Sequence, residues 1–297
     1  MVASKSKHSH GFWQMVLVGT IAALVVSVGF NYFAYRTTST SAAPVFEHYF
    51  VAAQGNDNND GTAYDKAFRT FDKAIAVVNK VPAAAVGRVT LYVGGNVYMT
   101  ASTVTLTRND ILIVNYDSTL GRSSISQLNP STAVLLHSTT FRIASASNVQ
   151  LKDVKLTNIV IDFSRAISNA LLDRVSVYLE PTLYADAPML DISGGSARTP
   201  SKNVTVTNSS FTSMAKPRSQ SIQSLVNIKN ANQVLVKGNT FDAYHDNPYV
   251  AFTLQNCDGV TVSSNTPSGT PANNRYWKYY AIDCKNASIA DDENTID

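Results

Sequence analysis

The sequence predicts an all-β solenoid in which short strands stack in parallel, and the first supporting observation is a repeat. The stretch KNVTVTNSSF at 202–211 returns as NQVLVKGNTF at 232–241. Two apolar residues two apart, a polar turn and an aromatic residue are the pattern of a strand followed by a bend. One such unit cannot bury its apolar face alone, so successive copies are expected to stack.

The second observation is that this strand recurs along the chain at unequal intervals, which indicates loops of different length between coils. With Val204 as the register position, the equivalent positions are Val149, Ala170, Val234, Val260 and Ala287, and Ile111 marks an earlier coil. In a solenoid, each such strand pairs in parallel with its counterpart one coil further on and buries its inward-facing Val, Ile and Leu side chains.

The third observation is that each register strand has alternating companions. The pairs that precede it are Phe141/Ile143, Ile159/Ile161, Leu190/Ile192, Val226/Ile228, Phe252/Leu254 and Tyr280/Ile282. A further strand is expected after it, at Val154/Leu156 and at Val175/Val177. Alternation of apolar and polar residues is typical of strands with one buried face, so three strands per coil are expected.

The body opens with an Asn/Asp/Gly-rich turn at 54–61, a helix predicted over 67–80 from its apolar spacing, and an alternating strand at 88–98 that is interrupted by a pair of glycines. With the Phe-Arg-Thr-Phe element at 68–71, this opening resembles the entry segment of the right-handed parallel β-helix proteins of the pectin-lyase-like superfamily. The resemblance extends over 49–297 and implies a right-handed parallel β-helix with an N-terminal capping helix. It implies no particular chemistry.

Residues 12–35 predict a single transmembrane helix ahead of this body. The segment has no charged residue and carries aromatic residues near both ends. A hydrocarbon core of about 30 Å needs roughly 20 helical residues, and aromatic side chains favour its interfaces. Lys5 and Lys7 precede the segment and Arg36 follows it, so the positive-inside bias weakly favours an extracytoplasmic body. The alternative is a cleaved signal peptide with a small-residue site at 41–43.

The predicted organisation is therefore a basic tail at 1–11, a membrane anchor at 12–35, a small polar linker at 36–48 and the β-helix at 49–297. The expected membrane partner is the lipid bilayer, contacted through 12–35. Three of the 24 basic residues precede position 40, which leaves 21 basic residues against 21 acidic residues in the remainder. A neutral body argues against nucleic acid as a partner, because phosphates require a basic footprint.

Asparagine side chains are predicted to form a ladder along the solenoid axis. The residues that directly precede the register positions are Asn148, Asn169, Asn203, Gln233, Gly259 and Asn286. Stacked amides can hydrogen-bond from coil to coil, as in cross-β ladders. The interpretation for Asn148, Asn169, Asn203 and Asn286 is therefore structural.

Cys257 and Cys284 each lie three residues before a register position, so they are expected to be neighbours in successive coils. A strand spacing of about 4.8 Å falls within disulfide reach. A disulfide and a reduced stacked pair both remain open. Without histidines at matching spacing, the two cysteines do not indicate a zinc site, and no cofactor or metal is expected.

Catalytic candidates are few. The polygalacturonase-like set of Asn-Thr-Asp, Asp-Asp, His-Gly and Arg-Ile-Lys does not occur in that order. Asp242, His245 and Asp246 form a weak candidate cluster in the turn after Phe241, because a histidine beside carboxylates can act as a general acid or base. Lys237 and Asp258 are expected on adjacent outer positions. The alternative is a solvated loop.

Arg275, Tyr276 and Trp277 combine a cation with aromatic faces and are the candidate ligand-binding residues. They could stack on sugar rings or form a protein interface. Alternatively, these aromatic residues cover the open end of the solenoid, as terminal coils require.

The leading functional hypothesis is a membrane-anchored β-helix that serves as a non-catalytic structural or recognition component. A virion membrane, a capsid or a cell surface is a setting that fits it, and other structural proteins or glycans are the expected partners. The alternative hypotheses are a carbohydrate-active enzyme, either a polysaccharide lyase or a glycosidase with a diverged site, and an adhesin-like glycan-binding module.

Overall fold

A computed structural model describes the chain over residues 45–82, 86–116, 123–127, 138–145, 147–181, 183–185, 187–217, 223–243, 249–267, 279–290 and 295–296. All of these residues belong to one compact unit, Val45–Asp297. Within them, no helix combines the length and the apolar character that crossing a membrane requires. The anchor predicted at 12–35 lies outside the described residues, and so does the preceding tail.

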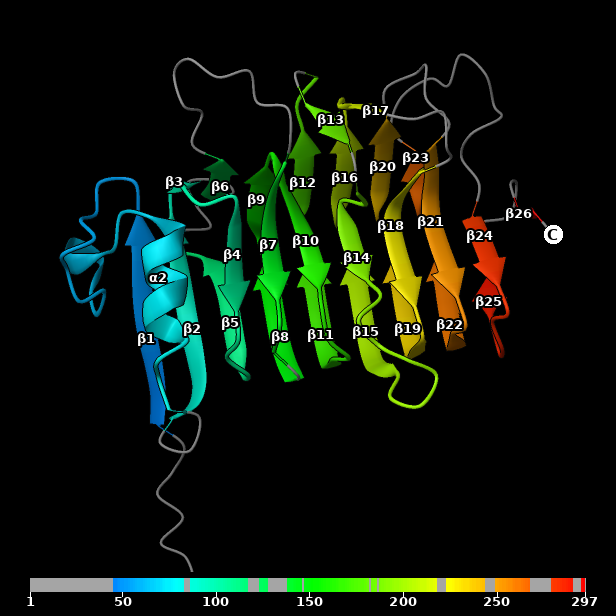
Figure 1. Cartoon of the computed structure of the whole chain (residues 1–297), viewed down its shortest axis with the longest axis horizontal. Helices are drawn as coiled ribbons and strands as arrows, with labels where there is room; N and C mark the ends of the chain where they lie inside the picture. Colours follow the sequence, from blue (N-terminus) through cyan, green and yellow to red (C-terminus); the bar gives the residue numbers. More distant parts are fainter. Residues whose placement is uncertain are drawn as a thin grey trace, which may run out of the picture. The chain divides into compact units, whose positions relative to one another are not determined.

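Three long parallel sheets account for most of the described strands. Sheet A contains β1 (Val45–Ala52), β2 (Val86–Gly94), β5 (Ile111–Asn115), β8 (Ser147–Lys152), β11 (Ser168–Asp173), β15 (Ser201–Thr207), β19 (Ala231–Lys237), β22 (Asp258–Ser263) and β25 (Ser288–Ile289), in that order. Figure 1 shows β8, β11, β15, β19 and β22 side by side in sequence order.

The other two long sheets follow the same order of coils. Sheet B contains β3 (Asn96–Met99), β6 (Ser123–Gln127), β9 (Val154–Thr157), β12 (Ser176–Leu179), β16 (Ser210–Ser213), β20 (Thr240–Ala243) and β23 (Thr266–Pro267). Sheet C contains β4 (Thr103–Leu106), β7 (Thr139–Ile143), β10 (Ile159–Phe163), β14 (Leu190–Ile192), β18 (Gln223–Lys229), β21 (Tyr249–Gln255), β24 (Tyr279–Ile282) and β26 (Thr295–Ile296). A short pair, β13 (Tyr184–Ala185) and β17 (Lys216–Pro217), stands beside them.

The strands of sheet A step from coil to coil in the register that the sequence predicts. Val204 pairs with Ala170 on one side and with Val234 on the other. Val149 pairs with Ile111 at the beginning of this series, and Val234 pairs with Val260 towards its end. In sheet C, two predicted positions are displaced, because Phe141 pairs with Ile161 rather than with Ile159, and Phe252 pairs with Tyr279 rather than with Tyr280. The prediction of a parallel β-helix solenoid with three strands per coil is therefore confirmed for the sheets, and for the register of sheet A.

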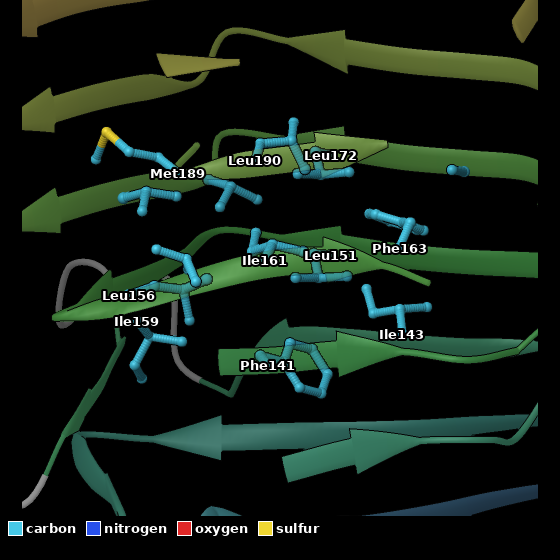
Figure 2. Close-up of a cluster of buried hydrophobic side chains, with 14 of the residues drawn as sticks. Phe141, Ile143, Leu151, Leu156, Ile159, Ile161, Phe163, Leu172, Met189 and Leu190 are labelled. Atoms are coloured by element: carbon cyan, nitrogen blue, oxygen red, sulfur yellow. The ribbon is translucent and has the colours of Figure 1, made fainter. Parts of the chain in front are cut away.

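The core lies between the three sheets, because each strand turns alternate residues inward. Figure 2 shows the middle coils, where Phe141, Ile143, Ile161 and Phe163 of sheet C face Leu151 and Leu172 of sheet A. These side chains are at most 1% exposed. Because every coil adds one layer of such side chains to a continuous core, burial rather than any single contact supports the stack.

The capping helix is present but shorter than predicted. After the 3-10 turn η1 (Tyr64–Lys66), α2 spans Phe71–Val78 and packs its buried side chains against β1, β3 and β4. Thr70 is the N-cap of this helix, because the Thr70 hydroxyl accepts a hydrogen bond from the Lys73 amide. Asp57, from the Asn/Asp/Gly turn, accepts hydrogen bonds from the Arg69 and Thr70 amides and so holds the preceding residues in an extended conformation.

Candidate recognition groove

The asparagine positions begin the strands of sheet A in a left-handed backbone conformation. The φ angles are 53° at Asn148, 62° at Asn169 and 53° at Asn203. Asparagine and aspartate tolerate this conformation better than other residues that carry a Cβ atom. The Asn169 side-chain amide donates to the Asn148 oxygen over 2.7 Å, and that of Asn203 donates to the Asn169 oxygen over 2.8 Å. Three coils are therefore joined by one amide ladder.

This ladder extends beyond asparagine at its beginning and is interrupted near its end. Asn148 donates to the carboxylate of Asp110, which precedes the register position of the earlier coil. After Asn203 the next two positions are Gln233 and Gly259, which keep the left-handed φ angles of 59° and 66°. Gly259 has no side chain, and among the described residues the Gln233 side chain has no hydrogen-bonding partner. Asn286 donates instead to Asp258, over 2.7 Å.

A polar groove opens where the ladder is interrupted. It consists of two adjoining hollows of about 480 Å³ and about 360 Å³, which share Asn232 and Asp258. The residues that line the polar groove are Ser196, Ala197, Pro200, Lys202, Asn230, Asn232, Gln233, Asn256, Cys257, Asp258, Gly259, Asp283 and Lys285. Hollows of several hundred cubic ångströms are of the size that small ligands fill.

One wall of the polar groove is a compact turn between β14 and β15. The Ser196 amide donates to the Thr199 carbonyl over 3.0 Å, and the Ser196 and Thr199 hydroxyl oxygens lie 2.8 Å apart. Gly195 places this turn against the stack, because a Cβ atom there would lie 2.7 Å from the Asn230 carbonyl oxygen. The Asn230 side chain donates to the Gly195 carbonyl over 3.1 Å. The wall is therefore fixed by the next coil.

The floor of the polar groove presents balanced charge and free amides. Lys202, Asp258, Asp283 and Lys285 are all exposed, and they carry two positive and two negative charges. Within the part of the chain that the structure describes, the side chains of Lys202, Asn232 and Gln233 make no hydrogen bond or ion pair. The groove can therefore both donate and accept hydrogen bonds to a ligand without carrying a net charge.

The cysteine pair lies beside the polar groove, which Cys257 lines. The Lys285 amide donates to the Cys257 carbonyl, and Asp258 pairs with Lys285, so the two cysteines are neighbours in successive coils. Both thiols are free in the structure, which corresponds to the reduced alternative. Burial raises the pKa of the Cys257 thiol to about 11, and the neighbouring Cys284 contributes in the same direction. The disulfide remains a prediction.

Elsewhere on the outer faces, carboxylates pair with side chains of the neighbouring coil. Arg142 of β7 contacts Asp162 of β10 over 3.0 Å, and Asn227 of β18 donates to Asp191 of β14 over 2.8 Å. Arg174 forms ion pairs with both Asp153 and Asp173. Exposed ion pairs of this kind each contribute about 0–1 kcal/mol, so their role is to align the coils rather than to hold them together.

The catalytic candidates are only partly described. Asp242 lies half-buried on β20 of sheet B, opposite Thr212, whereas His245 and Asp246 lie outside the described residues. The expectation that Lys237 and Asp258 occupy adjacent positions is wrong. In the register of sheet A, Asp258 pairs with Asn232 at the beginning of β19, and Lys237 pairs with Ser263 at the far end of β22.

The aromatic candidates Arg275, Tyr276 and Trp277 also lie outside the described residues. Among the described residues, no group of three or more His, Cys, Asp or Glu side chains is arranged to hold a metal ion. The polar groove was not predicted from the sequence, although the interruption of the ladder at Gln233 and Gly259 could have located it.

No protein-family model matches the chain, and no curated protein matches it. Among solved structures, the chain is similar to a rhamnogalacturonan lyase, with 14% sequence identity and a TM-score of 0.36. The similarity covers 83% of this chain and 64% of the lyase chain, so this chain spans less than two thirds of that lyase. No activity and no residue role follow from this similarity.

Proposed function

We propose that the chain is a membrane-anchored, right-handed parallel β-helix that acts as a non-catalytic recognition component, with the polar groove as its contact surface. The right-handed winding follows the strong preference of parallel crossover connections. The anchor rests on the length and apolar character of residues 12–35. A virion or cell surface would suit a body displayed in this way on the far side of the membrane.

The observation that carries the proposal is the contrast between the outer faces and the polar groove. Asp162, Asp173 and Asp191 each contact a side chain of a neighbouring coil, so these carboxylates help to align the coils. In the groove, by contrast, Lys202, Asn232 and Gln233 keep their hydrogen-bonding capacity. A surface that combines donors, acceptors and balanced charge suits a neutral, polyhydroxylated ligand such as a saccharide.

The test is to incubate the purified full-length chain, in detergent, with immobilised and soluble xylan, mannan and polygalacturonate. We expect retention of the protein on one of the neutral polymers, with the length of the soluble polymer unchanged by size-exclusion chromatography. The double variant Gln233→Ala/Lys285→Ala should weaken retention about tenfold, because it removes an amide and a cation from the groove.

The matched control is Lys155→Ala, which removes an exposed lysine from β9 of sheet B, outside the groove, and should leave retention unchanged. Shortening of any polymer, lost in the variant Asp242→Asn, would overturn the non-catalytic proposal in favour of a carbohydrate-active enzyme. If the groove variant and the native chain are retained equally, the groove is not the surface that binds the polymer.

A further inference from the structure

Four aromatic side chains gather on the outer face of sheet A at the first coils. Phe50 of β1 pairs in register with Tyr92 of β2, and both point away from the core because their neighbours Val51 and Val93 are buried in it. Tyr116 directly follows β5, and its amide donates to the Val93 carbonyl over 2.8 Å. Tyr64 comes from η1. We call these four residues the aromatic platform.

The rings of the aromatic platform hold one another in a fixed arrangement. Phe50 stacks on Tyr92 with ring centroids 5.1 Å apart, and Tyr64 stacks on Tyr116 with centroids 4.4 Å apart. The two stacks meet edge to face, at 79° between Phe50 and Tyr116. Such pairs stabilise each other beyond their area of burial, so the platform is preorganised before any ligand arrives.

Gly94 and Gln54 fix the position of Tyr64 in the platform. The Tyr64 ring lies over Gly94, where an added Cβ atom would be 2.8 Å from ring atom Cε2. Any other residue at position 94 would therefore displace the ring. The Gln54 side-chain amide donates to the Tyr64 hydroxyl over 2.6 Å, which orients the outer edge of the ring.

The platform is open to solvent at Tyr64 and Tyr116, whereas Phe50 and Tyr92 are half-buried. Tyr64 is 37% exposed and Tyr116 is 44% exposed. Contiguous exposed apolar surface on a protein marks a site of interaction. The edge of this surface carries hydrogen-bonding groups, namely the tyrosine hydroxyls, the Gln54 amide and the exposed imidazole of His48, whose ring lies 5.7 Å from that of Tyr92.

A track of outward side chains leads from the platform along the solenoid. In the register of sheet A, the row formed by Phe50 and Tyr92 continues at Val114 of β5. After Val114, each coil contributes one polar residue to the row, and neighbouring strands are about 4.8 Å apart. These polar residues are Lys152, Asp173, Thr207, Lys237 and Ser263. Beyond Val114, a linear polymer lying on the platform would therefore meet a new hydrogen-bonding side chain at each coil from β8 to β22.

From these observations we propose that the aromatic platform binds pyranose rings of a linear neutral polysaccharide. A pyranose ring presents an apolar C–H face, which matches the tyrosine faces, and a rim of hydroxyl groups, which matches the tyrosine hydroxyls, Gln54 and His48. The polymer continues along the track across sheet A. This site is separate from the polar groove, so each of the two can fail without the other.

The experiment compares variants of the full-length chain for binding to xylan and mannan by isothermal titration and by retention on the insoluble polymers. The double variant Tyr64→Ala/Tyr116→Ala should bind at least tenfold more weakly. Gly94→Ala keeps all four rings but displaces Tyr64, so it should weaken binding severalfold. The matched control is Tyr98→Ala on β3 of sheet B, because Tyr98 is 40% exposed and lies outside the platform.

Equal affinity of the native chain and the double variant would overturn the platform, and so would a failure of the native chain to bind either polymer. If Tyr64→Ala/Tyr116→Ala keeps the native affinity while Gln233→Ala/Lys285→Ala loses it, the polymer binds at the polar groove and not at the platform. Sedimentation velocity tests whether the platform binds a second copy of the chain instead of a polysaccharide. If the native chain is a dimer and the double variant is a monomer, the platform joins two copies, and the proposal is overturned.

Discussion

Replacing Asn239 by alanine is expected to lower the free energy of unfolding by about 1–3 kcal/mol, because it leaves the buried Ser209 amide without its hydrogen-bonding partner. The Asn239 side chain is 1% exposed. Its oxygen accepts from the Ser209 amide over 2.9 Å, and its nitrogen donates to the Val206 carbonyl over 2.9 Å. Urea unfolding of the full-length chain, followed by far-ultraviolet circular dichroism, measures the loss.

Two further variants show whether this loss comes from the buried hydrogen bonds. Asn239→Ser should be intermediate, because Ser209 occupies the equivalent place one coil earlier and its hydroxyl accepts from the Val175 amide over 3.1 Å. Asn232→Ala should change the free energy by no more than about 0.5 kcal/mol, since that side chain is half-buried and has no partner among the described residues. Equal effects of Asn239→Ala and Asn232→Ala would contradict the stabilising role of the buried Asn239 hydrogen bonds.

The second large effect is expected from Phe211→Ala, which should lower the free energy of unfolding by about 3–5 kcal/mol. Phe211 is fully buried, and its ring stacks on that of Phe241 with centroids 5.5 Å apart and a 7° interplanar angle. Removing the ring leaves a cavity between successive coils, which the flanking strands cannot close without losing register. Denaturant unfolding under the same conditions measures it.

Thr212→Ala is the matched control for Phe211→Ala, because Thr212 is the next residue on β16 and points to the outer face. We expect a change within about 0.5 kcal/mol. A loss as large as that of Phe211→Ala would mean that the inward and outward faces of β16 are assigned the wrong way round.

Much of the fold could be predicted because periodicity and burial agree along the whole body. The equivalence of Val149, Ala170, Val204, Val234 and Val260 follows from the repeat alone, and the pairing of sheet A confirms it. The helix prediction was too long at both ends. Its apolar spacing includes Phe68, which is buried in the core as part of an extended segment rather than as part of α2.

The surfaces could not be predicted to the same extent, because they depend on side chains that only the stacking brings together. Phe50, Tyr64, Tyr92 and Tyr116 lie on separate segments, and no local pattern connects them. The same holds for the buried hydrogen bonds of Asn239, since Val154 and Val175 occupy the corresponding place in earlier coils. The asparagine ladder was easier to predict, because a left-handed residue at a fixed place in each coil favours asparagine.

Both the polar groove and the aromatic platform depend on one claim, which is that successive coils stack in the parallel register of sheet A. Cysteine pairs introduced into the full-length chain, with Cys257 and Cys284 replaced by alanine, test it directly. Thr205 and Leu235 are partners in register, so the pair Thr205→Cys/Leu235→Cys should form a disulfide when copper phenanthroline and dioxygen oxidise the two thiols. Peptide mass mapping identifies the bond.

The comparison pair is Thr205→Cys/Lys237→Cys, which keeps the same outer face but is two residues out of register. Its Cα atoms would be roughly 8 Å apart, beyond the reach of about 7 Å that a disulfide allows. We predict rapid, nearly complete formation of the first disulfide and little of the second. Equal yields, or preferential formation of the out-of-register disulfide, would contradict the stacking on which both surfaces rest.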